Sequence, residues 1–410
     1  MICVMTYAAS TDIPTILFGA FDRHNFGDLL FPHIAAALLQ DENLIFAGLA
    51  ERDLRAYGGH QVQALARLAA AWGEQAVNII HVGGEILTCD AWQAAVMLLP
   101  PEQAQDIIAR LDSRPQQRLA WAQDRLGIPD LAPYALSRQL FPQAARVIYT
   151  GVGGVDLAQR DAALRCEVLA KLKAADRVSV RDQLTLAQLS AGGVTASLVP
   201  DPAVMVAELF GAKIRQRARQ GAAAEMLDAF PQGYIAVQFS ADFGDDATLA
   251  EIAAQLDRIA VSSGYGVVFF RAGAAPWHDD AACYQRVASR MQAAAVKVFS
   301  SLDLWDICAL IAHSRAYCGS SLHGRIVAMA FALPRVNLIH PAQSGAHTKQ
   351  AAYAAAWDTP DMPATLGVQD IAQGIRQALT VNPETRQHTA RQLAERYRRQ
   401  FKENLSRPTE

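Results

Sequence analysis

YCGSSLHGR, residues 317–325, is the stretch of sequence from which the fold can be worked out. An apolar, strand-like run ends within it, and a helical run over residues 326–333 begins after it. His323 and Arg325 lie at this strand-to-helix corner. In open α/β sheets, ligands bind beyond the carboxyl ends of the strands, where such corners are found. The stretch therefore predicts an α/β fold with a ligand site beside His323.

The residue types at this corner suit an anionic ligand. Ser320, Ser321 and Gly324 surround the predicted helix start, where free backbone N–H groups and the helix dipole favour a phosphate or a carboxylate. Arg325 adds a cation. His323, with an unperturbed pKa near ~6.5, can transfer a proton at neutral pH. The alternative is that Ser321 only caps the helix and His323 is a structural residue.

A second corner of the same construction is SVRD, residues 179–182. Arg181 follows an apolar strand-like run, and an arginine at a strand end can bind a carboxylate through two parallel N–H groups. Arg181 can equally pair with Asp182 or Asp201 in a structural salt bridge. The pattern leaves these two interpretations even.

A third corner is NFGD, residues 25–28, near the amino terminus. Its functional interpretation is that Gly27 lets the chain approach a substrate while Asp28 accepts a proton from a sugar hydroxyl. Its structural interpretation is a turn with a capping Asp. Glycines also follow two other strand-like runs, at residues 83–84 and 151–154. Tight turns explain such glycines more often than ligands do.

Composition narrows the class of protein. With 410 residues, 51% of them hydrophobic and 19% charged, the chain is expected to form two domains with sizeable cores. The formal charge of -3 argues against nucleic acid as the main partner. Six scattered cysteines without a C-x-x-C indicate reduced thiols. Residues 1–14 do not resemble a signal peptide, and no apolar run reaches membrane-spanning length, so we expect a cytoplasmic protein.

Apolar strand-like runs alternate with helical patterns along almost the whole chain. This alternation predicts two mostly parallel, Rossmann-like α/β domains facing each other across a cleft, an architecture called GT-B-like. A charge- and Gln-rich segment without a strand signal is the predicted boundary. The predicted units are a first domain at 1–210, a linker at 211–232, a second domain at 233–380 and a C-terminal helix at 381–410 that packs back on the first domain.

Common catalytic motifs are missing from the sequence. It has no G-x-x-x-x-G-K-[ST] phosphate loop, no H-E-x-x-H, no G-x-S-x-G and no G-x-G-x-x-G. It also lacks D-x-D, which weakens a metal-dependent reaction with a nucleotide sugar. His278 beside Asp279 and Asp280 is interpreted as a solvated helix start rather than a metal site. We therefore expect no metal.

Taken together and in this order, the motifs resemble the polysaccharide pyruvyl transferase family. Each motif is short, and the resemblance rests on the ordered set, which extends over residues 19 to about 340. The matching pieces are NFGD at 25–28, Gly83-Gly84, Gly151-Val152-Gly153, SVRD at 179–182, Asp201-Pro202, and SLHG at 321–324 followed by a helix ending at Pro334.

The resemblance implies an enzyme that uses phosphoenolpyruvate to place a pyruvate ketal on a sugar of a bacterial surface polysaccharide or its precursor. It implies that Asp28, on the acceptor side, is the base, and that Arg181 and His323 hold the donor. Phosphoenolpyruvate is then a co-substrate, no resident cofactor is expected, and the acceptor is a sugar or a lipid-linked oligosaccharide. Peripheral contact with a membrane is compatible with this reading. The remaining candidate substrate-binding residues are Asn25, Gly27, Gly83, Gly84, Gly153, Ser320, Ser321, Gly324 and Arg325.

Two positions depart from the family pattern. Many members carry Arg directly before the Leu-His pair, where this chain has Ser321, and the third residue of a glycine triplet is Glu85 here. Arg325, Arg271 and Lys349 are the candidates to replace the missing cation, and Arg325 is the one we expect. The alternatives to a pyruvyl transferase are a GT-B glycosyltransferase that uses a nucleotide sugar and a non-catalytic glycan-binding protein of the same fold.

Overall fold

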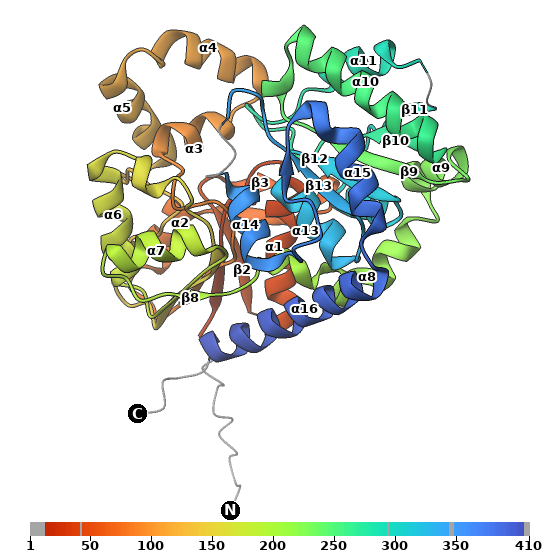
Figure 1. The fold of residues 1–410 in the computed structure, drawn as a ribbon. Helices are drawn as coiled ribbons and strands as arrows, with labels where there is room; N and C mark the ends of the chain where they lie inside the picture. Colours follow the sequence, from red (N-terminus) through yellow and green to blue (C-terminus); the bar gives the residue numbers. More distant parts are fainter. Residues whose placement is uncertain (1–12, 42, 293–294, 344–347, 406–410) are drawn as a thin grey trace, which may run out of the picture.

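The computed structural model describes residues 13–41, 43–292, 295–343 and 348–405, which form two α/β domains (Figure 1). The first domain is built on an eight-stranded sheet that is parallel except for β3, which runs antiparallel to β4. In spatial order its strands are β3 (Arg52–Asp53), β4 (Gln61–Ala64), β2 (Leu44–Gly48), β1 (Thr15–Phe18), β5 (Asn78–His81), β6 (Arg146–Val152), β7 (Arg177–Val180) and β8 (Ser197–Leu198).

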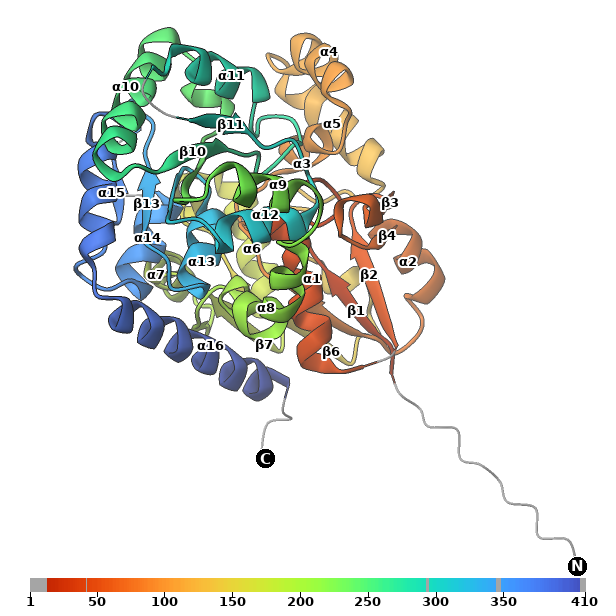
Figure 2. The ribbon, with the colours of Figure 1, turned by 90° about the vertical axis from the view of Figure 1, so that its right-hand side faces the viewer.

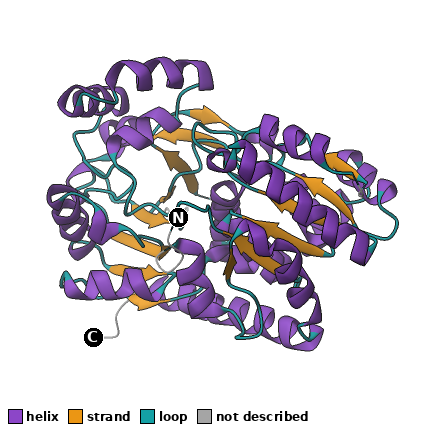
Figure 3. Ribbon diagram, turned by 45° about the horizontal axis from the view of Figure 1, so that its top comes forward, coloured by secondary structure: helices purple, strands orange, loops and turns teal. Residues whose placement is uncertain are grey.

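Helices connect these strands, and helices lie on both sides of the strands in each half of the molecule (Figure 3). Two of them, α4 and α5, stand out from the rest of the first domain at the upper edge of Figures 1 and 2. The helices of the first domain are α1 (Phe26–Leu39), α2 (Leu65–Trp72), α3 (Ala91–Met97), α4 (Pro101–Leu111), α5 (Pro115–Leu126), α6 (Ala162–Lys173) and α7 (Gln183–Ala191).

The second domain has a six-stranded, fully parallel sheet. Its strands in spatial order are β11 (Val296–Val298), β10 (Gly266–Phe269), β9 (Tyr234–Gln238), β12 (Ala316–Gly319), β13 (Arg335–Leu338) and β14 (Thr365–Leu366). Its helices are α10 (Asp246–Ser263), α11 (Ala281–Arg290), α12 (Leu304–Ala312), α13 (Leu322–Ala330), α14 (Lys349–Trp357) and α15 (Ile371–Thr380).

The segment between the sheets is helical and packed. It holds α8 (Val206–Arg217) and α9 (Gly221–Ala229), so the predicted linker at 211–232 is not an extended connection. Ile214 and Met226 from this segment are buried in the largest apolar cluster of the protein. That burial explains why the charge-rich sequence forms helices against the core.

This apolar cluster is shared between the two domains. It contains Leu29 and Phe31 of α1, which belong to the first domain, together with Trp305 of α12 and Ile326 of α13, which belong to the second. Each sheet has a further core of its own on its other face. Burial of apolar side chains is favourable, so this shared cluster holds the two domains against each other.

The C-terminal helix α16 (Pro383–Leu405) crosses the lower side of the molecule and contacts both halves (Figures 1 and 2). The Asn404 amide donates to the Ser179 hydroxyl at 3.4 Å, and the Arg396 guanidinium lies 4.8 Å from the ring centre of Trp357. Within the part of the chain that the structure describes, no helix combines the length and apolar character needed to cross a lipid bilayer.

Most predicted elements are present, with two differences that matter. The sequence pattern did not separate β2, β3 and β4, which are short and only partly buried. More importantly, α13 begins at Leu322, four residues before the predicted start at 326, with Ser321 as its N-cap. His323, Gly324 and Arg325 are therefore part of the helix, which decides where each side chain points.

Candidate functional site

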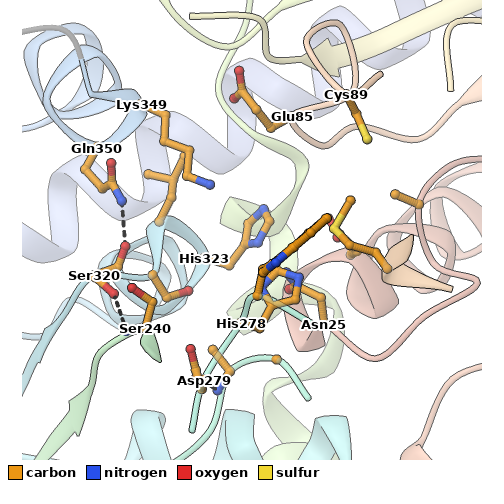
Figure 4. A pocket seen from close by; sticks show the side chains of 18 of the residues that line it. Asn25, Glu85, Cys89, Ser240, His278, Asp279, Ser320, His323, Lys349 and Gln350 are labelled. Carbon is orange, nitrogen blue, oxygen red and sulfur yellow. Dashed lines mark hydrogen bonds between the residues drawn. The ribbon is translucent and has the colours of Figure 1, made fainter. Parts of the chain in front are cut away.

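A cavity of about 430 Å³ lies between the domains, at the end of each sheet where the strand-to-helix corners meet. Side chains from both domains line it, and Figure 4 shows those labelled around its centre. It includes the predicted residues Asn25, Asp28, Arg181, Ser320, Ser321 and His323. The three corners singled out from the sequence thus meet in one place.

The first corner is fixed against the second domain. Asn25 caps α1, its side-chain oxygen accepting a hydrogen bond from the Gly27 N–H at 3.1 Å. The Phe26 N–H donates to the Ala272 carbonyl at 2.8 Å, and Asn25 pairs with Gly273 in a β-bridge. A Cβ at Gly27 would lie 2.0 Å from the His323 ring, so only glycine allows this approach. Gly27 therefore shapes the contact and does not line the cavity.

Asp28, in the first turn of α1, is a buried carboxyl without a cation at hydrogen-bond distance. The nearest guanidinium nitrogen, from Arg23, is 3.8 Å from its Oδ2 atom. Burial raises the pKa of Asp28 to about 6, although Arg23, Lys349 and Arg181 each act to lower it. A carboxyl of this kind is ionised at neutral pH and readily takes up a proton, as a general base must.

Arg181 lines the cavity and is also held in a double ion pair. Its Nη1 donates to Asp201 Oδ2 at 2.8 Å and its Nη2 to Glu85 Oε2 at 2.6 Å. The residue is 1% exposed. The structural interpretation, a salt bridge with Asp201, is therefore confirmed, and binding of a ligand carboxylate by Arg181 stays a prediction that its place in the cavity allows. Glu85, noted from the sequence only as a departure from the family pattern, lies in the same cavity.

His323 brings an unsatisfied nitrogen to the cavity. The residue is 8% exposed, and its Nε2 has no hydrogen-bond partner among the described residues. Burial lowers the pKa of His323 well below its ordinary value, and the positive charges of Arg181 and Lys349 lower it further. The imidazole is therefore neutral at pH 7 in the ligand-free protein, where the sequence alone had suggested a group near its midpoint.

Some residues around His323 line the cavity, and others only support the start of α13. Ser321 Oγ accepts from the Gly324 N–H at 3.2 Å and caps α13, while Ser320 Oγ accepts from the Ser240 N–H at 3.0 Å. Gly324 packs against Tyr317, whose ring a Cβ would meet at 2.4 Å, and it does not line the cavity. The cap occupies the Gly324 N–H, which leaves the N–H groups of Leu322 and His323 at the helix start to bind an anion.

Arg325 does not reach the cavity, which corrects the sequence prediction. It is 0% exposed, and its Nη2 lies 2.5 Å from Asp358 Oδ2. Arg335 donates to the other oxygen of the same carboxylate at 2.5 Å. Residues two apart on a helix point in nearly opposite directions. Since His323 faces the cavity, Arg325 faces the core.

Lys349 supplies the cation that Arg325 does not. It is the first residue of α14, it lines the cavity, and Figure 4 shows it and His323 pointing into the same space. Among the residues that the structure describes, no carboxylate pairs with Lys349. Arg271, the third candidate, does not line the cavity. The sequence analysis named Lys349 as a candidate but preferred Arg325, because no local pattern showed which of the three cations reaches the cavity.

The remaining predicted glycines shape the backbone beneath the site. Gly83 and Gly84 have φ angles of 120° and 97°, a region that favours glycine. A Cβ at Gly153 would lie 2.3 Å from Glu85 Oε2 and 2.8 Å from Arg181 Nε. Gly153 therefore lets the chain pass close to the ion pair of Arg181 and Glu85, and none of these glycines lines the cavity.

Sequence reasoning missed Asp279, a further cavity carboxyl whose pKa is raised. Asp280 caps α11, as a helix start requires, but His278 and Asp279 line the cavity. Asp279 accepts from the Ala272 N–H at 2.6 Å and from Gln238 Nε2 at 2.8 Å. Burial raises the pKa of Asp279 to about 7. In the described part of the chain, no group of three or more His, Cys, Asp or Glu side chains is arranged to hold a metal ion.

Comparisons with known proteins agree with this architecture. A family model described as polysaccharide pyruvyl transferase matches residues 25–340, most of the chain. No curated protein sequence matches.

Solved structures similar to this chain have the GT-B-like fold of two parallel-sheet domains. One is the UDP-GlcNAc 2-epimerase of Neisseria meningitidis bound to UDP-GlcNAc, with a TM-score of 0.51 and 10% identity over 96% of this chain and 99% of that one. Another is a putative UDP-N-acetylglucosamine 2-epimerase of Listeria monocytogenes, with a TM-score of 0.52 and 9% identity over 94% and 92%.

Proposed function

This chain belongs to the polysaccharide pyruvyl transferase family, and on that premise we propose that it forms a pyruvate ketal on a sugar, with phosphoenolpyruvate as donor. The acceptor in this proposal is a sugar of a bacterial surface polysaccharide or its precursor. One observation carries the proposal. A single cavity collects a buried base, two cations and a neutral histidine from both domains: Asp28, Arg181, Lys349 and His323.

The donor has two anionic ends, and the cavity offers a group for each. Lys349 and the free N–H groups at the start of α13 suit the phosphate, because both supply positive charge without a competing carboxylate. Arg181 suits the donor carboxylate. Its pairing with Asp201 and Glu85 uses one N–H on each terminal nitrogen and leaves a second N–H on each.

His323 lies between these groups and responds to the donor. An incoming phosphate dianion stabilises the imidazolium form and so opposes the burial that keeps the ring neutral. Donor binding is then accompanied by proton uptake at His323. A charged His323 can hold the phosphate and later return the proton to it as it leaves.

The chemistry matches the two carboxyls of raised pKa. Protonation of the enol carbon C3 uses the π electrons and leaves a cation-like C2. A first sugar hydroxyl bonds to C2 and loses its proton to Asp28, which is ionised at neutral pH. Phosphate then leaves with the electrons of its bond to C2, and a second hydroxyl closes the ketal. Asp279, whose pKa of about 7 keeps it partly protonated, can supply the proton for C3.

Proton balance in this scheme is complete. The two sugar hydroxyls together lose two protons when the ketal forms. One of these protons restores the acid that protonated C3, and the other leaves with phosphate or goes to solvent. No oxidant, reductant or further co-reactant is required.

Release of phosphate from phosphoenolpyruvate, with and without a glycan acceptor, tests the proposal. We expect acceptor-dependent release that falls by at least about 100-fold in Arg181→Ala and His323→Ala, in line with the loss of a positioned catalytic group. Arg258→Ala and His388→Ala, which remove exposed residues of the same types, are matched controls expected to keep full activity. Full turnover by folded Arg181→Ala and His323→Ala would show that the site is elsewhere.

Thermal shift separates this function from its rivals. The similar solved structures include an epimerase bound to a nucleotide sugar, which makes a nucleotide-sugar glycosyltransferase the alternative to test. We expect phosphoenolpyruvate to raise the melting temperature and uridine diphosphate to leave it unchanged. The reverse pattern would favour a glycosyltransferase. Binding of glycans without turnover of either donor would favour a non-catalytic glycan-binding protein.

A further inference from the structure

The turn Ala275-Pro276-Trp277-His278 holds its tryptophan in an unusual conformation. The His278 N–H donates to the Ala275 carbonyl at 3.2 Å, which closes a four-residue turn. Proline stands at its second position, and Trp277 at the third has a φ of 64°. In a type II turn, the third residue, which here directly follows the proline, has a positive φ, and glycine is favoured at this position. Here the bulkiest side chain occupies the glycine position.

Hydrogen bonds on both sides keep this turn in place. The Asp279 N–H donates to the Gly273 carbonyl at 3.2 Å, and the Ala241 N–H donates to the His278 carbonyl at 2.9 Å. Backbone strain in a non-glycine residue persists only where the surrounding structure imposes it, and such residues gather at functional sites. The strained conformation of Trp277 therefore calls for a functional reason.

The position of Trp277 indicates what that reason is. Trp277 is 48% exposed although it is a large apolar side chain, and it lines the cavity between the domains. Gln93 and Met97 of α3 line the same cavity from the first domain, and Asp242 and Gln343 line it from the second. An open aromatic ring among amide and carboxylate groups is suited to a ligand with an apolar face and many hydroxyls.

The turn also has a fixed relation to the proposed base. Residues just before it, Gly273 and Ala274, bond to the chain just before Asp28: Gly273 bridges to Asn25, and the Ala274 N–H donates to the His24 carbonyl at 3.2 Å. His24 Nδ1 lies 3.1 Å from the same N–H. A ligand on Trp277 is therefore held in register with the first turn of α1.

We propose that Trp277 is the platform on which the pyranose ring of the acceptor sugar stacks. This inference deepens the function proposed above and rests on it for the role of that sugar. The C–H face of the sugar packs on the indole, and its hydroxyls bond to Gln93 and Asp242. The exposed carboxylate of Asp242, which lines the same cavity, disfavours a nucleotide as the alternative occupant of this platform, because it would repel the phosphates.

Binding of simple sugars, measured without any donor, tests this platform. The probes are the methyl pyranosides of glucose, galactose, mannose and N-acetylmannosamine, followed by saturation-transfer NMR. For the pyranosides that bind the natural protein, we expect Trp277→Ala to weaken binding about tenfold and Trp277→Phe to weaken it less than threefold. Val261→Ala, which trims another exposed apolar residue, should bind as the natural protein does.

A glycine variant separates stacking from folding. Trp277→Gly removes the strain, so it should melt at or above the temperature of the natural protein while losing sugar binding as the alanine variant does. Its stabilisation by phosphoenolpyruvate should be unchanged. Equal sugar binding by Trp277→Ala and the natural protein would overturn the inference, as would uridine diphosphate binding that depends on Trp277.

Failure of the two proposals can be told apart. Sugar binding that depends on Trp277, in a protein that never releases phosphate from phosphoenolpyruvate, would refute the transferase function and keep the platform. Acceptor-dependent phosphate release with an unchanged acceptor KM in Trp277→Ala would support the transferase function and refute the platform.

Discussion

Buried charged groups lie on both sides of α13, and they are paired on one side and largely unpaired on the other. On the core face, Asp358 lies between Arg325 and Arg335, each 2.5 Å away. On the cavity face, Asp28 has its nearest cation 3.8 Å away, and His323 Nε2 has no hydrogen-bond partner among the described residues, its nearest carboxylate oxygen being Asp201 Oδ2 at 3.9 Å. The first cluster is satisfied within the protein, and the second is incomplete without a ligand.

The pKa values of the two carboxyls show the consequence. Both side chains are buried, with 3% of Asp358 and 9% of Asp28 exposed. The two guanidinium groups lower the pKa of Asp358 despite its burial, whereas burial raises the pKa of Asp28 to about 6. Ion pairing at hydrogen-bond distance stabilises a fold, and a carboxyl left without it becomes available for proton transfer.

Removing Arg325, on the core face of α13, should cause the largest change in the free energy of unfolding. Arg325→Met leaves Asp358 with one partner and Arg335 without its neighbour, and breaking a buried pair in this way typically costs ~3–5 kcal/mol. Chemical denaturation should show this loss of stability. The folded fraction should still bind phosphoenolpyruvate with normal affinity, because Arg325 does not line the cavity. Loss of donor affinity at unchanged stability would reverse the roles assigned to the two faces.

Neutralising the carboxyl of the cavity face should stabilise the protein while it abolishes turnover. The pKa of Asp28 is raised from 3.8 to about 6 on folding. The folded protein therefore loses stability as pH rises from about 4 to about 6, because the buried carboxyl is forced to ionise. Above pH 6, Asp28→Asn should therefore be more stable than the natural protein by at most about 3 kcal/mol.

The pH dependence provides the control for this prediction. As pH falls below the unfolded-state pKa of 3.8, the carboxyl becomes protonated in both the folded and unfolded states, so the two proteins should approach equal stability. In the natural protein, kcat/KM should rise through about pH 6 as Asp28 ionises. A stability difference that persists unchanged to pH 3.5 would contradict the buried-carboxylate explanation.

The smallest expected change is the loss of Lys349, the cation of the cavity face. Lys349→Met removes one charge-assisted contact to the donor, worth ~1.5–3 kcal/mol, so the Kd for phosphoenolpyruvate should rise about 10- to 100-fold. The melting temperature of the free protein should change little, because no carboxylate among the described residues forms a direct ion pair with Lys349, which acts on Asp28 only from a distance. Lys297→Met, at an exposed lysine of β11, is the matched control. Normal affinity in Lys349→Met would leave the phosphate without its proposed cation.

Much of the fold was predictable because it depends on local pattern. The strands Thr15–Phe18 and Arg177–Val180 are each a short apolar run before a loop and a helix, which is the alternation from which the α/β fold was predicted. The start of α13 was predicted four residues late. Ser321 had been considered as its cap, but the helical pattern was read only from the apolar residues that follow. That displacement is why Arg325 was expected in the cavity.

The sequence by itself determined that two α/β domains form and that Asp28, Arg181 and His323 lie at the ends of strands, because these properties follow from hydrophobic period and turn residues. Only the tertiary structure decided which side chains face the cavity. His323 and Arg325 are two positions apart, and the turn of the helix directs one to the ligand and the other to Asp358. Lys349 and Trp277 reach the cavity through packing between segments distant in sequence, and no local pattern records such packing.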